Sequence, residues 1–246
     1  MSDTQHNADK EQPVHSAHRF YMNSGPQINE RLESFWLILG QQGVLRFDQA
    51  QRVLGRMSPE PHKMKQPGIL SMERTRKLLR PWIDEGVLCY RAYFVRQKGV
   101  FWLTSKGYKY AKLNLRYYEP TPSSLPHLYA VNEIRLHLEA RYPNNVWKSE
   151  RELRAEQGAQ QKEHLPDAEF LDGQRITALE IMLNVRSETR LQDMLHALAT
   201  NNRYHAVWYF VSKPVFASLT QALNKLSVEQ QKHFIIYDLE ARPYKL

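Results

Sequence analysis

Cysteine is almost absent from this sequence, in which Cys89 is the only one among 246 residues. A single cysteine excludes a disulfide framework and any zinc site built from several cysteines. Long apolar runs are also lacking, because no stretch approaches the roughly 18 residues that a membrane-spanning helix requires. These two absences lead us to expect a cytoplasmic protein that does not contact a membrane.

Two common signatures of nucleotide chemistry are missing as well. The sequence contains no GxxxxGK[ST] loop and no GxGxxG segment after a predicted strand. Nucleotide hydrolysis and dinucleotide binding therefore have no support from sequence motifs. What remains is a chain of 42% hydrophobic residues, which is sufficient for one large or two modest domains.

Positive charge is concentrated in the N-terminal half. Residues 1–124 contain 19 Lys and Arg against 11 Asp and Glu, a net charge of +8, whereas residues 125–246 contain 15 of each and are neutral. Most of the excess lies in residues 63–116. A localised basic region is typical of nucleic-acid binding, and a solvated, lysine-rich surface is the alternative interpretation.

Hydrophobic periodicity organises the N-terminal half into helices followed by a hairpin. Ser71 is a candidate N-cap for the third helix, and Pro81 should kink or shorten that helix. Gly99 provides the positive φ expected at the hairpin tip, residues 96–99. The predicted helices cover residues 28–39, 47–54, 72–80 and 105–115, and the predicted strands cover residues 87–95 and 100–104.

Three helices followed by a basic hairpin is the order of a winged helix, which we assign to residues 27–116. In such a domain the third helix can enter the major groove of DNA, and the wing contacts phosphates. Some winged helices instead bind proteins, but the charge favours double-stranded DNA. The cations expected to face DNA are Arg74, Arg76, Lys77 and Arg80 on the third helix and Arg96 and Lys98 on the wing.

The remaining chain is divided by a proline-rich segment. We expect a disordered tail over residues 1–26, a linker over residues 117–127 and a second domain over residues 128–246. The pattern of this second domain predicts a mixed sheet with helices around it, and hence an α+β chain overall. Its predicted helices cover residues 128–142, 187–199 and 214–226, and its strands cover residues 146–153, 164–171, 175–185, 206–211 and 234–239.

Two carboxylates in the second domain are predicted to converge. Strand alternation places Glu180 on one face of its strand with Ala178 and Met182. A carboxylate on such an apolar face is costly unless it is paired or bound to a cation. Asp167, on the preceding strand of the hairpin, could meet Glu180, and Mg²⁺ or Mn²⁺ would relieve their repulsion. A salt bridge from Glu180 to Arg186 or Arg190 is the alternative.

The order of a helix, Glu150, the pair Pro166-Asp167 and Glu180 resembles the PD-(D/E)XK nuclease superfamily. The combination of an N-terminal winged helix with the pattern W…E…PD…ALE…S…RL is similar, more narrowly, to the replication-relaxation proteins, which include the MobC-type plasmid relaxases. The resemblance covers residues 28–240. It implies metal ligation by Asp167 and Glu180, and it makes Glu150 a third acidic residue of the site.

The resemblance also assigns further roles, with one departure. His164, three residues before the Asp, would orient water or phosphate. Met182 stands where the family often has a lysine or a second glutamate. Arg186 or Lys148 could supply the missing positive charge, although arginine is a poor base because its pKa stays above about 12. Arg186 would then stabilise phosphate charge without activating water.

Two functions follow from this pattern. The first is a MobC-type relaxase that recognises a plasmid transfer origin and nicks one strand by metal-dependent chemistry. A mobilisation accessory protein could be its partner, and the chain could form a homodimer. The second is a DNA-binding accessory, replication or transcription factor whose nuclease-like domain is inactive. The trio Glu150, Asp167 and Glu180 favours the first function, and Met182 favours the second.

Overall fold

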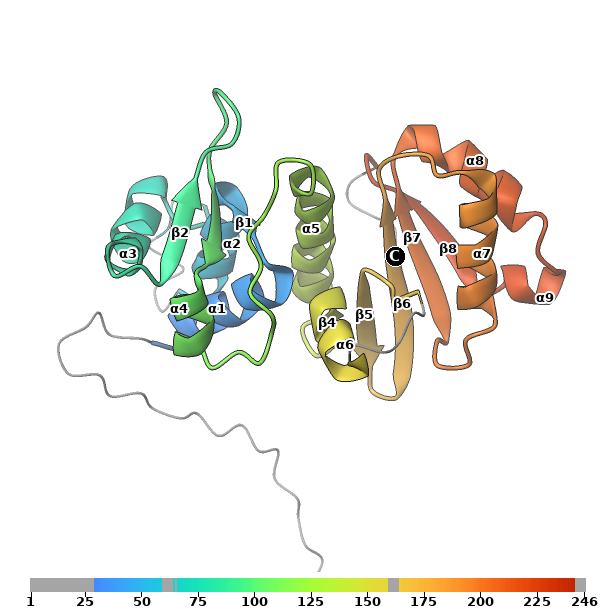
Figure 1. Ribbon diagram of the computed structural model, residues 1–246, viewed down its shortest axis with the longest axis horizontal. Helices are drawn as coiled ribbons and strands as arrows, with labels where there is room; N and C mark the ends of the chain where they lie inside the picture. The colour runs from blue at the N-terminus through green and yellow to red at the C-terminus, as the bar shows by residue number, and fades with distance from the viewer. Residues whose placement is uncertain (1–28, 59–63, 65, 159–163, 242–246) are drawn as a thin grey trace, which may run out of the picture.

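The computed structural model describes residues 29–58, 64, 66–158 and 164–241, and it is an α+β structure with two sheets (Figure 1). The expectation of an α+β chain is confirmed. The tail predicted for residues 1–26 lies outside the described residues, as do residues 59–63 and 65, which precede the third helix. Within the described part, no helix has the length and apolar character needed to cross a bilayer.

In its described residues, the N-terminal half combines four helices with a small antiparallel sheet of order β1-β3-β2. Apolar side chains of the first three helices form its core against this sheet, with Phe35, Leu39 and Leu54 almost inaccessible to solvent. The elements are α1 (Glu30–Gln42), β1 (Leu45–Arg46), α2 (Phe47–Arg56), α3 (Met72–Asp84), β2 (Leu88–Arg91), β3 (Val100–Leu103) and α4 (Ser105–Tyr110).

Helix α3 continues past the proline that was expected to shorten it. Ser71 caps the helix, since its hydroxyl accepts a hydrogen bond from the Arg74 amide at 3.3 Å. Pro81 lies inside the helix, which ends at Asp84. The last turn carries Trp82, which is buried against Trp36, and this packing offsets the backbone hydrogen bond that proline cannot donate. The expected shortening at Pro81 was therefore wrong, whereas the expected kink stays a prediction.

The hairpin differs from its prediction in length and in the role of its glycine. Strand β2 ends at Arg91, four residues earlier than expected. Positive φ occurs at Arg96, with a value of 63°, and not at Gly99. Gly99 is required for a different reason: a Cβ atom there would lie 2.6 Å from the Arg91 carbonyl oxygen and 2.7 Å from the Tyr90 ring.

The C-terminal half is built on a five-stranded mixed sheet of order β4-β5-β6-β7-β8. Strands β4, β5 and β6 pair antiparallel, whereas β7 and β8 join β6 in parallel. The elements are α5 (Leu125–Arg141), β4 (Val146–Ser149), α6 (Glu150–Gln157), β5 (Ala168–Asp172), β6 (Arg175–Met182), α7 (Glu188–Ala199), β7 (Ala206–Val211), α8 (Lys213–Leu223), α9 (Val228–Gln231) and β8 (Phe234–Asp238).

Helices cover both faces of this sheet (Figure 1). On one face, Leu179 and Ile181 of β6 pack against α5. On the other face, Ala178 and Met182 pack against α7 and α8. The alternation of β6 therefore separates two cores, and Glu180 belongs to the face of Ala178 and Met182. A carboxylate on this apolar face requires a polar or charged group at the edge of the apolar layer to pair with it.

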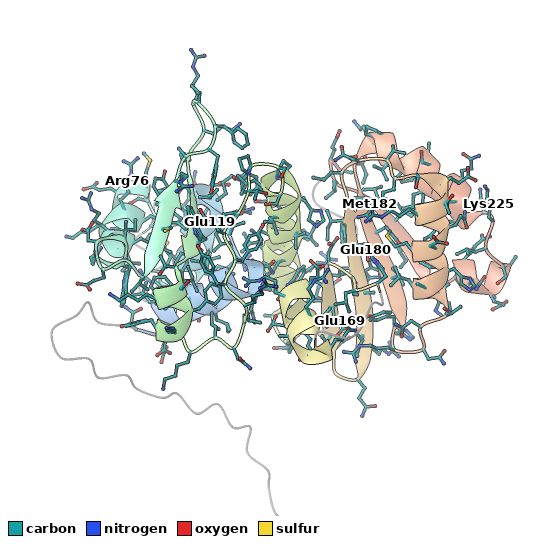
Figure 2. All side chains as sticks on the ribbon, in the orientation of Figure 1. Arg76, Glu119, Glu169, Glu180, Met182 and Lys225 are labelled. Carbon is teal, nitrogen blue, oxygen red and sulfur yellow. The ribbon has the colours of Figure 1, made fainter. Side chains whose placement is uncertain are left out.

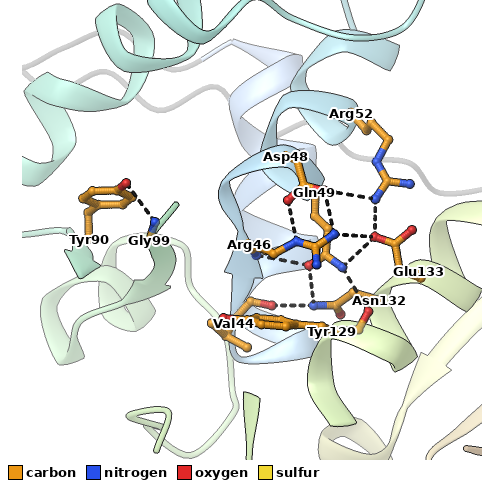
Figure 3. A network of polar contacts seen from close by, with 10 residues as sticks. All are labelled: Val44, Arg46, Asp48, Gln49, Arg52, Tyr90, Gly99, Tyr129, Asn132 and Glu133. Atoms are coloured by element: carbon orange, nitrogen blue, oxygen red, sulfur yellow. Dashed lines mark hydrogen bonds and ion pairs between the residues drawn. The ribbon is translucent and has the colours of Figure 1, made fainter. Parts of the chain in front are cut away.

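Helix α5 stands between the two halves and contacts both. Its Leu136 joins the core of the N-terminal half, whereas its Ile134 joins the core of the large sheet. A buried polar network reinforces the contact (Figure 3): Gln49 donates to Glu133 at 2.9 Å, and Asn132 donates to the Val44 carbonyl at 2.7 Å. These hydrogen bonds fix α2 and β1 against α5. The boundary at residues 117–127 stays a prediction, since the helix that follows it is shared.

Candidate functional site: a carboxylate pair and a basic surface

Strand register brings Asp167 and Glu180 together. Ala168 of β5 is paired with Leu179 of β6. One further step in this register places Asp167, the residue before β5, opposite Glu180. The Asp167 Oδ2 atom accepts a hydrogen bond of 2.7 Å from the Ile181 amide, which anchors the carboxylate to β6. The hairpin itself thus holds the two acids at one end of the sheet.

Each carboxylate of this pair is also engaged by a histidine. The Oε1 atom of Glu180 lies 2.6 Å from Nε2 of His164. The Oδ1 atom of Asp167 lies 2.9 Å from Nε2 of His127, in the first turn of α5. His164 was among the predicted site residues, whereas His127 was not. The two carboxylates lie between the two imidazoles, one histidine on each acid, and we call this group the carboxylate pair with its two histidines.

Burial and mutual repulsion alter the protonation of this group. Glu180 is 1% exposed, and its burial, together with the negative charge of Asp167, raises its pKa to about 7 despite the opposing effect of His164. Burial on its own lowers the pKa of His127, but the hydrogen bond to Asp167 and the negative charges of the nearby acids together outweigh it, so that the pKa is raised. The pKa of His164 is raised in the same way by Glu180.

Glu150 lies beside this group, but its side chain turns elsewhere. Its amide donates to the Asp167 carbonyl at 3.0 Å, so that the first residue of α6 is fixed next to Asp167. Its carboxylate accepts from Arg154, one helical turn further on, at 3.0 Å. Glu150 was expected on a strand and begins a helix instead, because Ser149 and Glu152 form a capping box there.

Arg186 and Lys148, the two residues that could replace the lysine absent at position 182, lie in different surroundings. Arg186, half-buried after β6, is close enough to lower the pKa of Glu180. Lys148 forms an ion pair with Glu156. Met182 is 1% exposed and packs among the apolar residues of α7 and α8, close to Glu180 in Figure 2. Its position is therefore a core position in this fold.

The donor set at the carboxylate pair is small. In the described part of the chain, no group of three or more His, Cys, Asp or Glu side chains is arranged to hold a metal ion. Asp167 and Glu180 alone are a pair of hard oxygen ligands, and Mg²⁺ is commonly held by one or two carboxylates together with water and substrate phosphate. The residues are therefore compatible with a divalent ion whose remaining ligands are water and phosphate.

A large cavity between the two halves opens onto Asp167. Its volume is about 780 Å³. Asp167, His127 and Glu150 line one side, and Gln41 and Tyr118 line the other. Three arginines also line it: Arg116, Arg151 and Arg154. Glu180 is not part of the lining, so that Asp167 is the accessible member of the pair and Glu180 the buried one.

Arg151 is held rigidly at the wall of this cavity. Its guanidinium group donates to the Gly40 carbonyl and to the Tyr108 hydroxyl, each at 2.5 Å, and also to the Arg116 carbonyl. It lies over the ring of Tyr118, with 5.6 Å between its central carbon and the ring centroid. The contacts join α6 to the N-terminal half, and they keep a fixed positive charge near Asp167.

The basic residues of the N-terminal half lie on its surface. Arg74, Arg76, Lys77 and Arg80 are exposed along α3, and Arg96 and Lys98 are exposed on the hairpin loop. Figure 2 shows Arg76 on the opposite half of the molecule from Glu180. Arg80 is partly neutralised by Asp84, at 2.9 Å. The predicted DNA-contacting cations and the carboxylate pair are therefore two separate sites.

Two side-chain contacts near the carboxylate pair could not be predicted from the sequence. His127 lies next to the proline-rich segment, and nothing in its local pattern connects it with an acid 40 residues later. Glu169 is 1% exposed and forms two hydrogen bonds with Arg203, at 2.6 and 2.7 Å. Both contacts depend on the tertiary arrangement, so that local spacing could not reveal them.

Comparisons with protein-family models, curated proteins and solved structures find no match to this chain. The functional interpretation consequently rests on its own residues and their geometry.

Proposed function

We propose that the chain is a DNA-binding protein that nicks one strand of a plasmid transfer origin with the help of Mg²⁺ or Mn²⁺. The N-terminal half would be the winged helix that recognises duplex DNA. The C-terminal half would be the PD-(D/E)XK-like domain that cleaves it. A mobilisation accessory protein and a homodimer belong to the same proposal.

Duplex binding is supported by the arrangement of the N-terminal half. Three helices precede an antiparallel hairpin, and β1 completes the small sheet of order β1-β3-β2. Helix α3 exposes a row of cations, and the recognition helix of such a domain lies in the major groove. The hairpin loop presents two further cations beside it. This combination of exposed helix and basic loop suits phosphate and base contacts.

Strand cleavage is supported above all by the burial of Glu180 against Asp167. At neutral pH, a carboxyl group whose pKa is about 7 is only partly ionised, because burial and Asp167 oppose its charge. A divalent cation between the two acids would offset both the cost of burying the Glu180 charge and its repulsion by Asp167. Bound there, the cation would neutralise charge on a phosphodiester and activate water.

The protein's own residues divide the remaining tasks. Asp167 and Glu180 would hold the cation, and Glu150 is one backbone hydrogen bond away from Asp167. His127 and His164 fix the two carboxylates by hydrogen bonds, and their imidazoles, whose pKa values are raised, can hold a proton beside the site. Arg151 offers fixed positive charge to a phosphate in the 780 Å³ cavity, and Arg186 stabilises charge near Glu180.

One observation favours the second function, a non-cleaving accessory, replication or transcription factor. Met182 is packed into the core between β6 and two helices, so that no amine stands two residues after Glu180. A base or a leaving-group acid would then have to come from a histidine. If neither histidine can serve, the C-terminal half acts in docking or dimerisation and the N-terminal half alone carries function.

The deciding experiment is a nicking assay. Supercoiled plasmid that carries the transfer origin of the protein's own genetic element is incubated with the protein and Mg²⁺ or Mn²⁺. Asp167→Asn and Glu180→Gln are compared with Asp172→Asn, which changes an exposed carboxylate at the far end of the same strand. We expect metal-dependent open circles, reduced at least about 100-fold in the first two variants and unchanged in the third.

Duplex binding is measured in parallel, by fluorescence anisotropy at several salt concentrations. Binding that weakens with salt but is accompanied by no nicking at any metal concentration would contradict the cleavage and support the accessory function. Absence of both would contradict the whole proposal.

A further inference from the structure

A second cavity lies on the N-terminal half, far from the carboxylate pair. Its volume is about 350 Å³, within the range of roughly 300–1,000 Å³ that is usual for small-ligand sites. It is enclosed between α3 and the hairpin, and its walls are mainly apolar. The lining residues are Phe47, Arg76, Lys77, Leu79, Arg80, Ile83, Tyr90 and Phe101.

Tyr90 is the aromatic residue of this cavity that remains open to solvent. Its side chain is 41% exposed, whereas Phe47 and Phe101 are 2% exposed each. Phe101 supports one side of its ring, with 4.8 Å between the two centroids, and Phe47 meets its edge at 6.2 Å. The cavity thus has a buried aromatic floor and one accessible aromatic ring.

The ring of Tyr90 is also fixed in orientation. Its hydroxyl oxygen accepts a hydrogen bond of 3.0 Å from the Gly99 amide across the hairpin (Figure 3). The absence of a Cβ atom at Gly99 permits this approach, since such an atom would lie 2.7 Å from the ring. An exposed tyrosine held at both its ring and its hydroxyl loses little entropy when a flat ligand stacks on it.

Positive charge surrounds the opening. The cavity lining contains three exposed cations on α3 and, within the described residues, no carboxylate. Arg76 lies 5.8 Å and the Lys98 ammonium 5.5 Å from the centroid of the Phe47 ring. Since α3 and the hairpin loop contribute these charges from two sides, a ligand in the cavity would be flanked by cations. A flat aromatic ligand with negative charge on both sides is the complementary chemistry.

We propose that this cavity holds one unpaired nucleobase of DNA, stacked on Tyr90, with the flanking phosphates on Arg76, Lys77 and Lys98. Base stacking on an aromatic side chain is tolerant of sequence, and it is typical of proteins that bind single strands. The inference rests on the DNA binding of the proposed function but does not require strand cleavage. It specifies the substrate class as DNA with a locally unpaired nucleotide, such as a bulge or a hairpin loop.

The experiment compares two short duplexes of the same sequence, one perfectly paired and one with a single unpaired 2-aminopurine. Affinity is measured by anisotropy, and stacking by quenching of the 2-aminopurine fluorescence. We expect the wild type to bind the unpaired substrate about tenfold more tightly and to quench it. Tyr90→Leu should remove both the preference and the quenching, while binding to the paired duplex stays unchanged.

Two further variants separate stacking from folding. Tyr90→Phe keeps the ring but loses the hydrogen bond to Gly99, and should retain most of the preference. Ile83→Trp fills the cavity without changing charge, and should remove the preference. Circular dichroism and thermal unfolding show whether each variant is folded.

The outcomes distinguish this inference from the proposed function. Equal affinity for both duplexes with no quenching would overturn the nucleobase site and leave duplex binding intact. A preference that survives in folded Tyr90→Leu would overturn it as well. Failure to bind either duplex would contradict the inference together with the DNA binding on which it depends.

Discussion

The two halves of this molecule treat charge in opposite ways. The N-terminal half displays cations on its surface, along α3 and the hairpin loop, where solvent reaches them. The C-terminal half has no net charge and places acids in its interior: Glu169 and Glu180 are 1% exposed each. Each of these buried acids has a positively charged or protonatable partner, Arg203 for one and His164 for the other.

This difference separates two physical tasks. Exposed cations attract a polyanion at long range, are weakened by salt, and require little precision in position. Buried acids are costly to desolvate, and they remain in a fold where their partners are held in place. The first arrangement suits capture of DNA, and the second suits chemistry or precise structure. The predictions below test each half by removing its characteristic charges.

The largest expected effect is on DNA affinity. Replacing Arg74, Arg76, Lys77 and Arg80 by glutamine should weaken duplex binding about 1,000-fold at low salt and lower the slope of log affinity against log salt by about 3 to 4. The measurement is anisotropy across a salt series. The control replaces Arg190, Lys213, Lys225 and Lys232, exposed cations of the other half, by glutamine. An equal loss in the control would show that net charge, and not the surface of α3, governs binding.

The second prediction concerns a buried acid outside the proposed site. Arg203→Met should destabilise the fold by about 3 kcal/mol, because Glu169 would remain buried without its two hydrogen bonds. Chemical denaturation gives the free energy of unfolding. Lys232→Met, which breaks an exposed ion pair with Glu229, should change it by less than about 0.5 kcal/mol. Similar losses in both variants would mean that the burial of Glu169 does not matter.

Much of the fold could be predicted from local patterns. Helical spacing located α1, α2 and α3, and the apolar run at β7 indicated a buried strand. The errors arose where tertiary contacts override local preference. Trp82 holds the turn of α3 beyond Pro81, and the capping box at Ser149 turns a predicted strand into the helix that begins at Glu150.

The candidate site was predictable to a smaller extent. Alternation along β6 indicated that Glu180 faces an apolar layer, and hairpin pairing indicated that Asp167 could lie opposite it. The partner histidine His127 could not be predicted, because it reaches Asp167 through the packing of α5 against one face of the sheet. The contact between the Glu150 carboxylate and Arg154 could not be predicted either, because it forms only when a helix begins at Glu150.

The third prediction uses the pH dependence of the buried pair. The pKa of Glu180 in the folded protein is about 7, above the ordinary value of 4.5 for a glutamate, so that the folded state binds an additional proton between these values. Stability should therefore fall as pH rises from 4.5 through 7, by about 3 kcal/mol. His164 changes the stability in the same direction. Because its pKa is raised in the folded protein, the stability that its protonated form contributes is also lost as pH rises.

Glu180→Gln tests this linkage. We expect the variant to be more stable than the wild type at pH 8 and to show a flatter dependence between pH 5 and pH 8 in thermal unfolding. Asp172→Asn, an exposed carboxylate on the same hairpin, should follow the wild type. Parallel curves for wild type and Glu180→Gln would show that burial of this acid does not determine the pH dependence.

The smallest expected effect addresses how the basic surface is held in place. Ser71→Ala removes the hydroxyl that accepts from the Arg74 amide, and should cost about 1 kcal/mol of stability. Because the cap orders the first turn of α3, which carries Arg74, duplex affinity should also fall by a few-fold. Ser187→Ala is the matched control: Ser187 precedes α7 without a capping hydrogen bond from its side chain, so the same substitution should be nearly neutral. A loss of stability without any loss of affinity would place the DNA contacts away from the N-terminal turn of α3, towards Arg80 and the hairpin.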